Sequence, residues 1–370
     1  MEKLRIGIVG CGGIANSKHF PALKSQADKC EMVAFCDTVP ERAEKACREY
    51  GAEGAKWYTD YNELLKDKSI DVVHVLTPNV AHCPITVAAF EAGKHVMCEK
   101  PMAATTEDAE KMMAAWKKSG KKFTIGYQNR FRRDAQMLKR ACVEGKLGEV
   151  YFAKAHAVRR RAVPTWGVFP NKALQGGGPL IDVGTHALDI TLWCMDNYKP
   201  VSVMGSVFEK LGSLPEAAEA NMFGPWDVND FQVEDSAFGF VKMENGATIF
   251  LESSWALNVR SSLEAATTLC GTKAGAEMVG GMSGAGGYDL IINETTGGVL
   301  TEEHISAGDS VAFFEGDNGG GEAQKEAKQW LEAIINDTEP LVKPEQAFVV
   351  TQILDNIYKS AREGKEIKLN

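Results

Sequence analysis

The sequence predicts a two-domain protein of the α/β class. We expect an N-terminal domain with a doubly wound parallel sheet over residues 1–128, and an α+β domain with an open, mostly antiparallel sheet over residues 129–370. Three observations lead to this prediction. Short apolar runs alternate with helical patterns in the first third of the chain, and longer runs of alternating polarity follow. A chain of 370 residues is also too long to fold around one small hydrophobic core. The closing helices of the second domain are free to pack back on the first.

Five apolar runs in the first domain have the length of buried parallel strands. They span residues 4–9, 32–36, 72–76, 95–98 and 123–125. Helical patterns with recognisable ends lie between them: Pro40 opens one that ends before Gly51, and Gly93 and Gly120 close two others. Strands and helices that alternate at this spacing predict right-handed βαβ crossovers and a parallel sheet.

The pattern changes after about Gln128. A helix is predicted over residues 132–144, and long alternating strands over 150–158, 201–208, 236–243 and 247–254. Because a short turn at residues 244–246 joins two of these strands, we expect antiparallel pairing. Glycine-rich stretches at 275–287 and 319–321 are expected as surface loops, and residues 323–336 and 344–363 as closing helices.

Composition indicates an ordinary globular protein and disfavours several partners. Hydrophobic residues make up 44% and charged residues 25%, enough to bury a sizeable core. With 41 Lys and Arg against 50 Asp and Glu, the net charge of -9 argues against nucleic acid as a partner. The 9 cysteines lack C-x-x-C and zinc-type spacing, so we expect reduced, mostly buried thiols and no metal. No apolar run suits a membrane, and a cytoplasmic location is expected.

A glycine-rich turn follows the first predicted strand. Residues 10–15 read Gly-Cys-Gly-Gly-Ile-Ala, a G-x-G-x-x-A sequence between a strand and a helix. Gly10 permits the tight turn, Gly12 lets a pyrophosphate approach the backbone, and Ala15 lets the helix pack on the strand. Gly13 and Ile14 complete this predicted cofactor-binding turn.

Asp37 lies at the end of the second predicted strand, 22 positions beyond Ala15. A carboxylate there can bind the adenosine ribose hydroxyls, and it repels the 2'-phosphate of NADP. We therefore expect NAD rather than NADP as the cofactor. The alternative role is an N-cap for the helix that begins at Pro40, and one carboxylate can serve both.

Four motifs in chain order resemble the glucose-fructose oxidoreductase, inositol dehydrogenase and rhizopine catabolism (Gfo/Idh/MocA) family. They are the glycine turn, Thr77-Pro78-Asn79 with His82, Glu99-Lys100-Pro101, and Asp182-Val183-Gly184-Thr185-His186. The resemblance covers essentially the whole chain. It implies a Rossmann domain, a C-terminal open sheet that holds sugar-like substrates, and a homodimer or homotetramer built on that sheet.

The middle motifs lie just past the ends of predicted parallel strands, where open sheets bind ligands. Together with the resemblance, this places Thr77, Asn79, His82 and Glu99 at the cofactor, and Lys100 at both cofactor and substrate. An ammonium group at Lys100 can hydrogen-bond the substrate oxygen whose charge changes as hydride moves. The alternatives are a solvated surface lysine for Lys100 and a helix-start role for His82.

Asp182 and His186 lie four residues apart in a helix predicted to start after the glycines at 176–178. A histidine titrates near neutral pH, so His186 suits the general base for oxidation of an alcohol. Asp182 either contacts substrate or holds the imidazole. The alternative for His186 is a core histidine bonded to a carbonyl. Asp189, three residues further, is predicted to be structural.

A loop with three arginines and a tryptophan is the candidate substrate wall. Arginine hydrogen-bonds sugar hydroxyls and tryptophan stacks on a pyranose, which favours Arg159, Arg160, Arg161 and Trp166 as contacts. A solvated charge run with one packing tryptophan is the alternative. Further substrate-side candidates are Tyr127, Gln128, Asn129 and Arg130 at the domain junction and, more weakly, Trp255.

These features predict an NAD-dependent oxidoreductase that moves a hydride between the nicotinamide and a ring secondary hydroxyl of a sugar, a glycoside or a cyclitol. C3 of a pyranose is a candidate carbon. Two alternatives stay open: a glycosidase of the same family that works by transient oxidation and elimination, and a non-catalytic sensor that only binds the dinucleotide. Lys100, Asp182 and His186 argue against the sensor, because a binding module has no use for an acid/base set.

Overall fold

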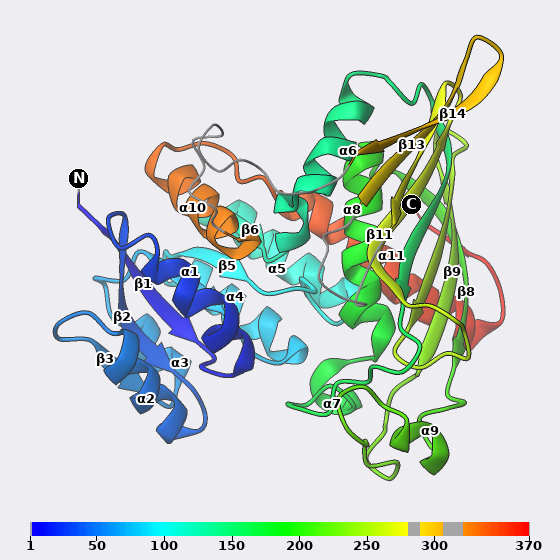
Figure 1. Ribbon diagram of the computed structural model, residues 1–370. Coiled ribbons are helices and arrows are strands. Elements are labelled where there is room, and N and C mark those ends of the chain that lie inside the picture. The colour runs from blue at the N-terminus through cyan, green and yellow to red at the C-terminus, as the bar shows by residue number, and fades with distance from the viewer. Residues whose placement is uncertain (1, 280–288, 306–320, 370) are drawn as a thin grey trace. The chain divides into compact units, whose positions relative to one another are not determined.

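The computed structural model describes residues 2–279, 289–305 and 321–369 (Figure 1). The chain forms two compact units. Unit 1 comprises residues 1–128 and 317–348, and unit 2 comprises residues 129–316 and 349–370. Each unit is therefore assembled from two separate segments of the chain.

Unit 1 is built on a parallel sheet in the order β3-β2-β1-β4-β5-β6, the strand order of a Rossmann domain. Its strands are β1 (Leu4–Val9), β2 (Cys30–Cys36), β3 (Lys56–Tyr58), β4 (Val72–Val75), β5 (His95–Cys98) and β6 (Phe123–Ile125). This confirms the predicted doubly wound domain. No sequence pattern indicates β3, because it is a three-residue edge strand whose Lys56 and Trp57 are exposed.

The helices of unit 1 follow the strands as the βαβ pattern predicts. They are η1 (Ala15–His19), α1 (Phe20–Lys24), α2 (Pro40–Tyr50), α3 (Tyr61–Leu65), η2 (Asn79–Ala81), α4 (His82–Glu91), α5 (Thr106–Ser119) and α10 (Glu322–Ile335). Gly120 ends α5 in the left-handed conformation, at a φ of 66°, as its predicted stop role requires. The core that contains Phe20 and Phe35 also contains Trp330 and Leu331 of α10. A helix from near the end of the chain thus completes the first core.

Unit 2 is built on a mostly antiparallel sheet in the order β14-β13-β12-β11-β7-β10-β9-β8-β15. Its strands are β7 (Val150–Val158), β8 (Pro200–Phe208), β9 (Ser236–Met243), β10 (Thr248–Ser254), β11 (Leu263–Gly271), β12 (Ala274–Val279), β13 (Asp289–Thr296), β14 (Val299–Ile305) and β15 (Ile367–Lys368). One pair, β7 with β10, is parallel. The prediction of an open, mostly antiparallel sheet is confirmed.

The predicted glycine-rich loop at 275–287 is wrong in its first part. Residues 274–279 form β12, which pairs with both β11 and β13 and buries Ala276 and Met278. Small residues hid this strand, because Ala and Gly give little of the polarity contrast that marks a strand in sequence. Residues 280–287, and 319–320 of the second predicted loop, lie outside the described residues.

Helices cover one face of the unit 2 sheet (Figure 1). The helical elements of this unit are η3 (Gln128–Phe131), α6 (Arg133–Val143), α7 (Lys172–Gln175), η4 (Leu180–Gly184), α8 (Thr185–Met195), α9 (Pro215–Glu219) and α11 (Pro344–Glu363). Gly205 and Gly239 let α11 approach closely: a Cβ on Gly205 would lie 2.6 Å from Ile357. On the opposite face, Met204, Phe208 and Phe240 are 55%, 39% and 42% exposed.

Two further expectations concern thiols and membranes. All 9 cysteines are free, and burial raises the pKa of Cys11 and of Cys36 to about 12. Such thiols stay protonated and unreactive near neutral pH. Within the part of the chain that the structure describes, no helix has the length and apolar character needed to cross a membrane.

Candidate active site

The glycine turn after β1 has the geometry that a dinucleotide phosphate requires. Gly10 adopts a φ of 97°, and a Cβ there would lie 2.5 Å from the carbonyl oxygen of Leu76. Only glycine fits that position. A Cβ on Gly12 or Gly13 would meet no protein atom within 4 Å, so both face open space. The turn therefore leaves bare backbone at the start of the helical run, and Ile14 beside it is 38% exposed.

Asp37, directly after β2, ties this turn to the next loop. Its Oδ2 accepts from the Cys11 backbone N–H at 2.9 Å, and its Oδ1 accepts from the Val39 N–H at 2.9 Å. The N-cap residue of α2 is Val39, and no side chain caps this helix, so the alternative that Asp37 is its N-cap is wrong. The carboxylate instead holds the loop that precedes α2. Each carboxylate oxygen has a second lone pair, which suits it to accept from a ribose hydroxyl as well.

The other predicted cofactor residues lie at the same edge of the sheet. Strands β1, β4 and β5 are neighbours, so the loops that follow them meet at their common carboxyl ends. Thr77 and Asn79 follow β4, and both are partly exposed. Lys100 follows β5, joined to Pro101 by a cis peptide bond. Residues 96–99 and 101–103 are buried on either side, whereas Lys100 keeps partial exposure.

Glu99 and His82 are buried, unlike Lys100, Thr77 and Asn79. The Glu99 carboxylate contacts Lys18 and His19, which hold its pKa well below the usual range against the effect of burial. The ring nitrogens of His82 lie 2.8 Å from the Pro101 carbonyl oxygen and 3.0 Å from that of Thr77. This geometry supports a role for His82 in holding two loops together, which the sequence did not predict. His82 is also the first residue of α4, the position that the helix-start alternative gives it.

Unit 2 presents Asp182 and His186 from an otherwise buried segment. Every other residue between 177 and 194 is buried, whereas Asp182 and His186 are partly exposed. The chain enters α8 through η4, a π-helical turn that contains Asp182, whereas the sequence predicted one regular helix. π-turns of this kind occur frequently at functional sites, because they reposition side chains relative to a regular helix.

Trp255 orients Asp182. Its indole N–H donates to Asp182 Oδ2 at 3.0 Å, and its side chain is fully buried. The weaker expectation that Trp255 contacts sugar directly is therefore wrong. Its position after β10 signalled proximity to the site, but the sequence could not show that the indole N–H points to Asp182.

A buried carboxylate fixes the start of the same segment. Glu234 accepts from the backbone N–H of Gly178 at 2.9 Å and of Leu180 at 3.2 Å, and from the Tyr358 hydroxyl at 2.6 Å. Burial raises the pKa of Glu234. A Cβ on Gly177 would collide with the Tyr358 hydroxyl, which explains the glycine there. Sequence reasoning missed this group, because its members are distant in the chain and form no local motif.

In the loop with the arginines and the tryptophan, some side chains bond to other parts of unit 2 and others are exposed to solvent. Arg159 makes a two-pronged ion pair with Glu264, and it also donates to the Ala162 carbonyl at 3.0 Å. Arg160 is exposed. Trp166 is 52% exposed and lies edge-on to Phe169 and Phe223. Trp166 and Arg160 therefore stay the stronger predictions for sugar contact.

The predicted junction residues are mostly buried. Tyr127 is fully buried, and Arg130 forms a fully buried two-pronged pair with Asp189, with N–O distances of 2.9 and 2.6 Å. The structural role predicted for Asp189 is what the structure shows. Gln128 accepts from Lys18, and Asn129 keeps partial exposure.

Comparison with known proteins identifies the family. Residues 4–127 match the oxidoreductase family with an NAD-binding Rossmann fold, and residues 139–369 match the C-terminal alpha/beta domain of the same family. The chain belongs to the Gfo/Idh/MocA oxidoreductase family. This confirms the resemblance and makes the protein an oxidoreductase.

Several members of the Gfo/Idh/MocA family are similar over large parts of the chain. D-glucoside 3-dehydrogenase of Escherichia coli (strain K12) is 34% identical over 370 residues, which cover 99% of this chain and 97% of that protein. Inositol 2-dehydrogenase of Salmonella typhimurium is 34% identical over 202 residues, 54% of this chain and 57% of its own length. The crystal structure of aldose-aldose oxidoreductase from Caulobacter crescentus complexed with glycerol aligns over 100% of both chains, with 26% identity and a TM-score of 0.77.

Proposed function

We propose that this Gfo/Idh/MocA protein is an NAD-dependent dehydrogenase of a ring secondary alcohol in a sugar, glycoside or cyclitol. The observation that carries the proposal is the selective exposure of Lys100, Asp182 and His186, each flanked by buried residues. Titratable side chains kept at the surface of buried segments are typical of acid/base sites. The similarity to a D-glucoside 3-dehydrogenase along the whole chain supports C3 of a pyranoside as the oxidised carbon.

Unit 1 would hold the cofactor. The bare backbone at Gly12 and Gly13 accommodates the diphosphate, and Asp37 accepts from the adenosine ribose hydroxyls. Thr77 and Asn79 lie where the nicotinamide half of a dinucleotide binds in such sheets. NAD, when bound, accepts the hydride from the alcohol carbon. The Asp37 carboxylate and the sequence Thr38 to Glu41, which brings no cation, favour NAD over NADP.

The reacting alcohol needs a proton acceptor and a donor for its oxygen. We assign the acceptor to the His186 imidazole, which takes the hydroxyl proton as the C–H bond gives up its hydride and a carbonyl forms. The Lys100 ammonium donates to the same oxygen. Asp182, oriented by Trp255, accepts from a neighbouring hydroxyl or from the imidazole. Trp166 and Arg160 supply a ring face and a hydrogen-bond donor for the sugar.

Cofactor choice is tested by calorimetric titration with NAD and NADP. NAD should bind more tightly, and Asp37→Ala should reduce this preference. A tenfold preference for NADP, about 1.4 kcal/mol in the opposite direction, would reject the role assigned to Asp37.

Substrate and chemistry are tested with methyl glucosides, free hexoses and inositols, scored by NADH absorbance. His186→Ala and Lys100→Met should each lower turnover by roughly 100-fold while NAD binding persists. His304→Ala, at an exposed histidine of β14, is the matched control and should keep full activity. Near wild-type turnover in His186→Ala or Lys100→Met would refute that residue's role. Release of an aglycone without net NADH would instead identify the glycosidase chemistry.

A further inference from the structure

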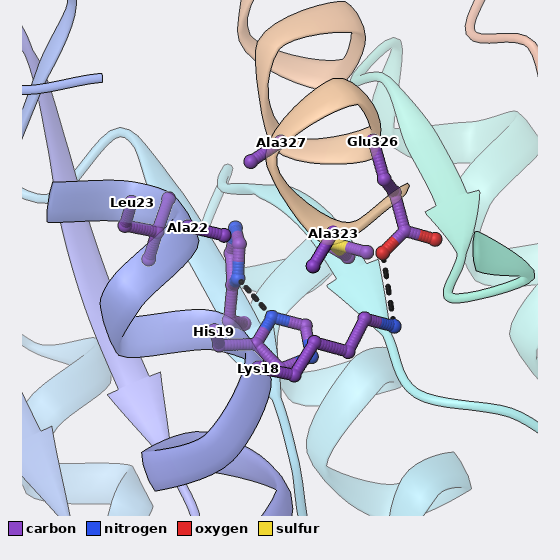
Figure 2. Close-up of a pocket in the computed structure, with 9 residues that line it drawn as sticks. Lys18, His19, Ala22, Leu23, Ala323, Glu326 and Ala327 are labelled. Carbon is purple, nitrogen blue, oxygen red and sulfur yellow. Dashed lines mark hydrogen bonds and ion pairs between the residues drawn. The ribbon is translucent and has the colours of Figure 1, made fainter. Parts of the chain in front are cut away.

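Unit 1 contains a buried group of charged side chains beside the carboxyl end of β5. Lys18 and His19 come from η1, Glu99 follows β5, and Glu326 comes from α10; we call these four residues the Lys18 cluster. Their side chains are only 7%, 3%, 6% and 5% exposed, respectively. Figure 2 shows Lys18 reaching from η1 to Glu326 on α10, around a small pocket that alanines also line.

Every proton of the Lys18 ammonium group has an acceptor within unit 1. The Nζ atom lies 2.6 Å from Glu99 Oε1, 2.9 Å from Glu326 Oε2 and 3.2 Å from Gln128 Oε1. An ammonium group has three protons, so these contacts use its full donor capacity. Lys18 is therefore built into the protein as a fixed cation rather than held ready for a ligand.

Glu99 connects this cation to Lys100. Its Oε1 contacts Lys18 and lies 2.8 Å from His19 Nε2, while its Oε2 accepts from the backbone N–H of Lys100 at 3.1 Å. A Cβ on Gly126 would lie 2.9 Å from Glu99 Oε1, so the carboxylate also lies close to the backbone there. The turn that presents Lys100 is thus fixed by a carboxylate that Lys18 itself holds.

The charges of the Lys18 cluster favour this arrangement near neutral pH. Lys18 and His19 keep Glu99 ionised, and burial raises the pKa of Glu326 to about 7. Burial lowers the pKa of His19 and of His74 on β4, whose Nδ1 lies 3.3 Å from His19 Nδ1, so both imidazoles are neutral. Both carboxylates therefore balance the Lys18 charge, and Glu326 is only partly ionised near neutral pH.

We propose that Lys18 and Glu326 are positioning residues for Lys100. Lys18 fixes the Glu99 carboxylate that orients the Lys100 turn, and Glu326 holds the Lys18 ammonium from the opposite side. The inference rests on the proposed catalytic function of Lys100, and it assigns to α10 a part in the activity. A displacement of about 1 Å at a reacting group can lower a rate by roughly 100-fold, so rigidity of this turn matters for catalysis.

The kinetic test compares four variants. Lys18→Met should lower kcat by roughly tenfold or more at saturating substrate and change the Kd for NAD by less than about threefold. Glu326→Ala should lower kcat by a smaller factor, and Glu326→Gln should restore it, because the amide oxygen still accepts from Lys18. Lys94→Met is the matched control: Lys94 is a buried lysine at the other end of β5, bonded to the Asp67 and Ile70 carbonyls at 2.8 Å. It should lose thermal stability but keep kcat.

A second measurement needs no sugar. An amine-reactive reagent is applied to each folded variant, and the labelling rate of Lys100 is followed by mass spectrometry. Lys18→Met and Glu326→Ala should change this rate by about threefold or more, whereas Glu326→Gln and Lys94→Met should match the wild type. If no sugar is oxidised by the wild type, the proposed function fails, and the labelling result still decides whether the Lys18 cluster positions Lys100.

Three results would overturn the proposal. One is a folded Lys18→Met variant with unchanged kcat and unchanged Lys100 labelling. Another is an equal loss of kcat in Lys94→Met, which would indicate a general effect of removing a buried lysine. The third applies if Lys18→Met does not fold, in which case Glu326→Ala and Glu326→Gln are compared instead. Wild-type kcat and wild-type Lys100 labelling in Glu326→Ala would then refute the positioning role.

Discussion

Trp255 shows how a buried residue can set the geometry of a partly exposed one. Its indole N–H is directed at Asp182, and a hydrogen bond to a charged group contributes about 1.5–3 kcal/mol. Trp255→Phe keeps the ring and removes this donor. We expect kcat/KM to fall roughly tenfold or more, measured by steady-state kinetics. Trp116→Phe, which removes a similar indole bond to the Lys121 carbonyl in unit 1, serves as the control and should leave kcat/KM unchanged.

Glu326 makes stability depend on pH in a defined direction. Its folded pKa of about 7 lies above the ordinary value of 4.5, so the native state retains a proton that the unfolded chain has released. Stability must therefore fall as pH rises from about 4.5 to about 7. Glu99, with its lowered pKa, acts oppositely and destabilises the protein only as pH falls below about 4.5.

Glu326→Gln isolates the first effect. The amide does not ionise, so the variant should gain stability relative to the wild type as the pH is raised from 5 to 8. Urea unfolding at several pH values measures this difference. Parallel curves for the two proteins would contradict the raised pKa of Glu326.

Residues with a local signal could be predicted from the sequence. Gly10, Lys100, Asp182 and His186 lie in short motifs, and the structure gives each the exposure or backbone geometry that its proposed role needs. Lys18 and Glu326 could not be predicted, because they are hundreds of positions apart and only folding brings an ammonium and a carboxylate together. A buried ion pair leaves no periodicity in the sequence, and its partners become visible only in three dimensions.

At the scale of elements, the start of the η4 and α8 segment depends on Glu234 and Tyr358. Tyr358→Phe removes one hydrogen bond to the buried carboxylate, so we expect the free energy of unfolding to fall by about 1–2 kcal/mol. Denaturant titration measures the change, and kinetics should show a lower kcat. Tyr151→Phe is the control, because Tyr151 is 54% exposed. Equal stabilities of the two variants would show that the Tyr358 bond contributes nothing.

The loop that carries Trp166 is the element expected to decide sugar affinity. Its ring is half-exposed and supported edge-on by two phenylalanines, which keeps a flat face available for a pyranose. Trp166→Ala should raise KM for the sugar by roughly tenfold and leave the Kd for NAD unchanged. An unchanged KM would show that Trp166 does not contact the sugar and that other residues of unit 2 form the substrate wall.

Element prediction succeeded where burial produces an apolar pattern and failed where it does not. Strands β1, β2, β4, β5 and β6 are buried on both faces, and each was predicted within two residues of its bounds. Edge strand β3 and the glycine-containing β12 lack that pattern. The π-turn η4 could not be predicted, because the groups that contact its start lie far along the chain. The Glu234 carboxylate accepts from the Gly178 N–H, and the Ser253 hydroxyl donates to the Pro179 carbonyl.

At the scale of the whole molecule, the exposed apolar side chains on one face of the unit 2 sheet predict self-association. Met204 and Phe240 are register partners on neighbouring strands, and both are exposed. A contiguous apolar patch of this kind marks an interaction surface. We propose a homodimer or homotetramer, the assembly that the family resemblance implies.

Light scattering tests this assembly. Phe240→Lys should shift the protein toward the monomer, because it places a charge within an apolar interface. Val143→Lys is the control: Val143 is 72% exposed on α6, away from that sheet face, and the change should not alter the mass. A wild-type protein that is monomeric at micromolar concentration would refute the interface.

The two-segment construction of unit 1 has a consequence for biosynthesis. When residue 128 leaves the ribosome, the sheet can form, but Trp330, Leu331 and the carboxylate of Glu326 have not yet been translated. At about 5–20 residues per second, roughly 10–40 s pass before the roughly 200 residues up to α10 are added. During that interval the nascent chain carries an unfinished core and a lysine without one of its carboxylates. The core of unit 1 and the Lys18 cluster are therefore completed only after α10 has been translated, and chaperone contact during elongation should be concentrated on this N-terminal segment.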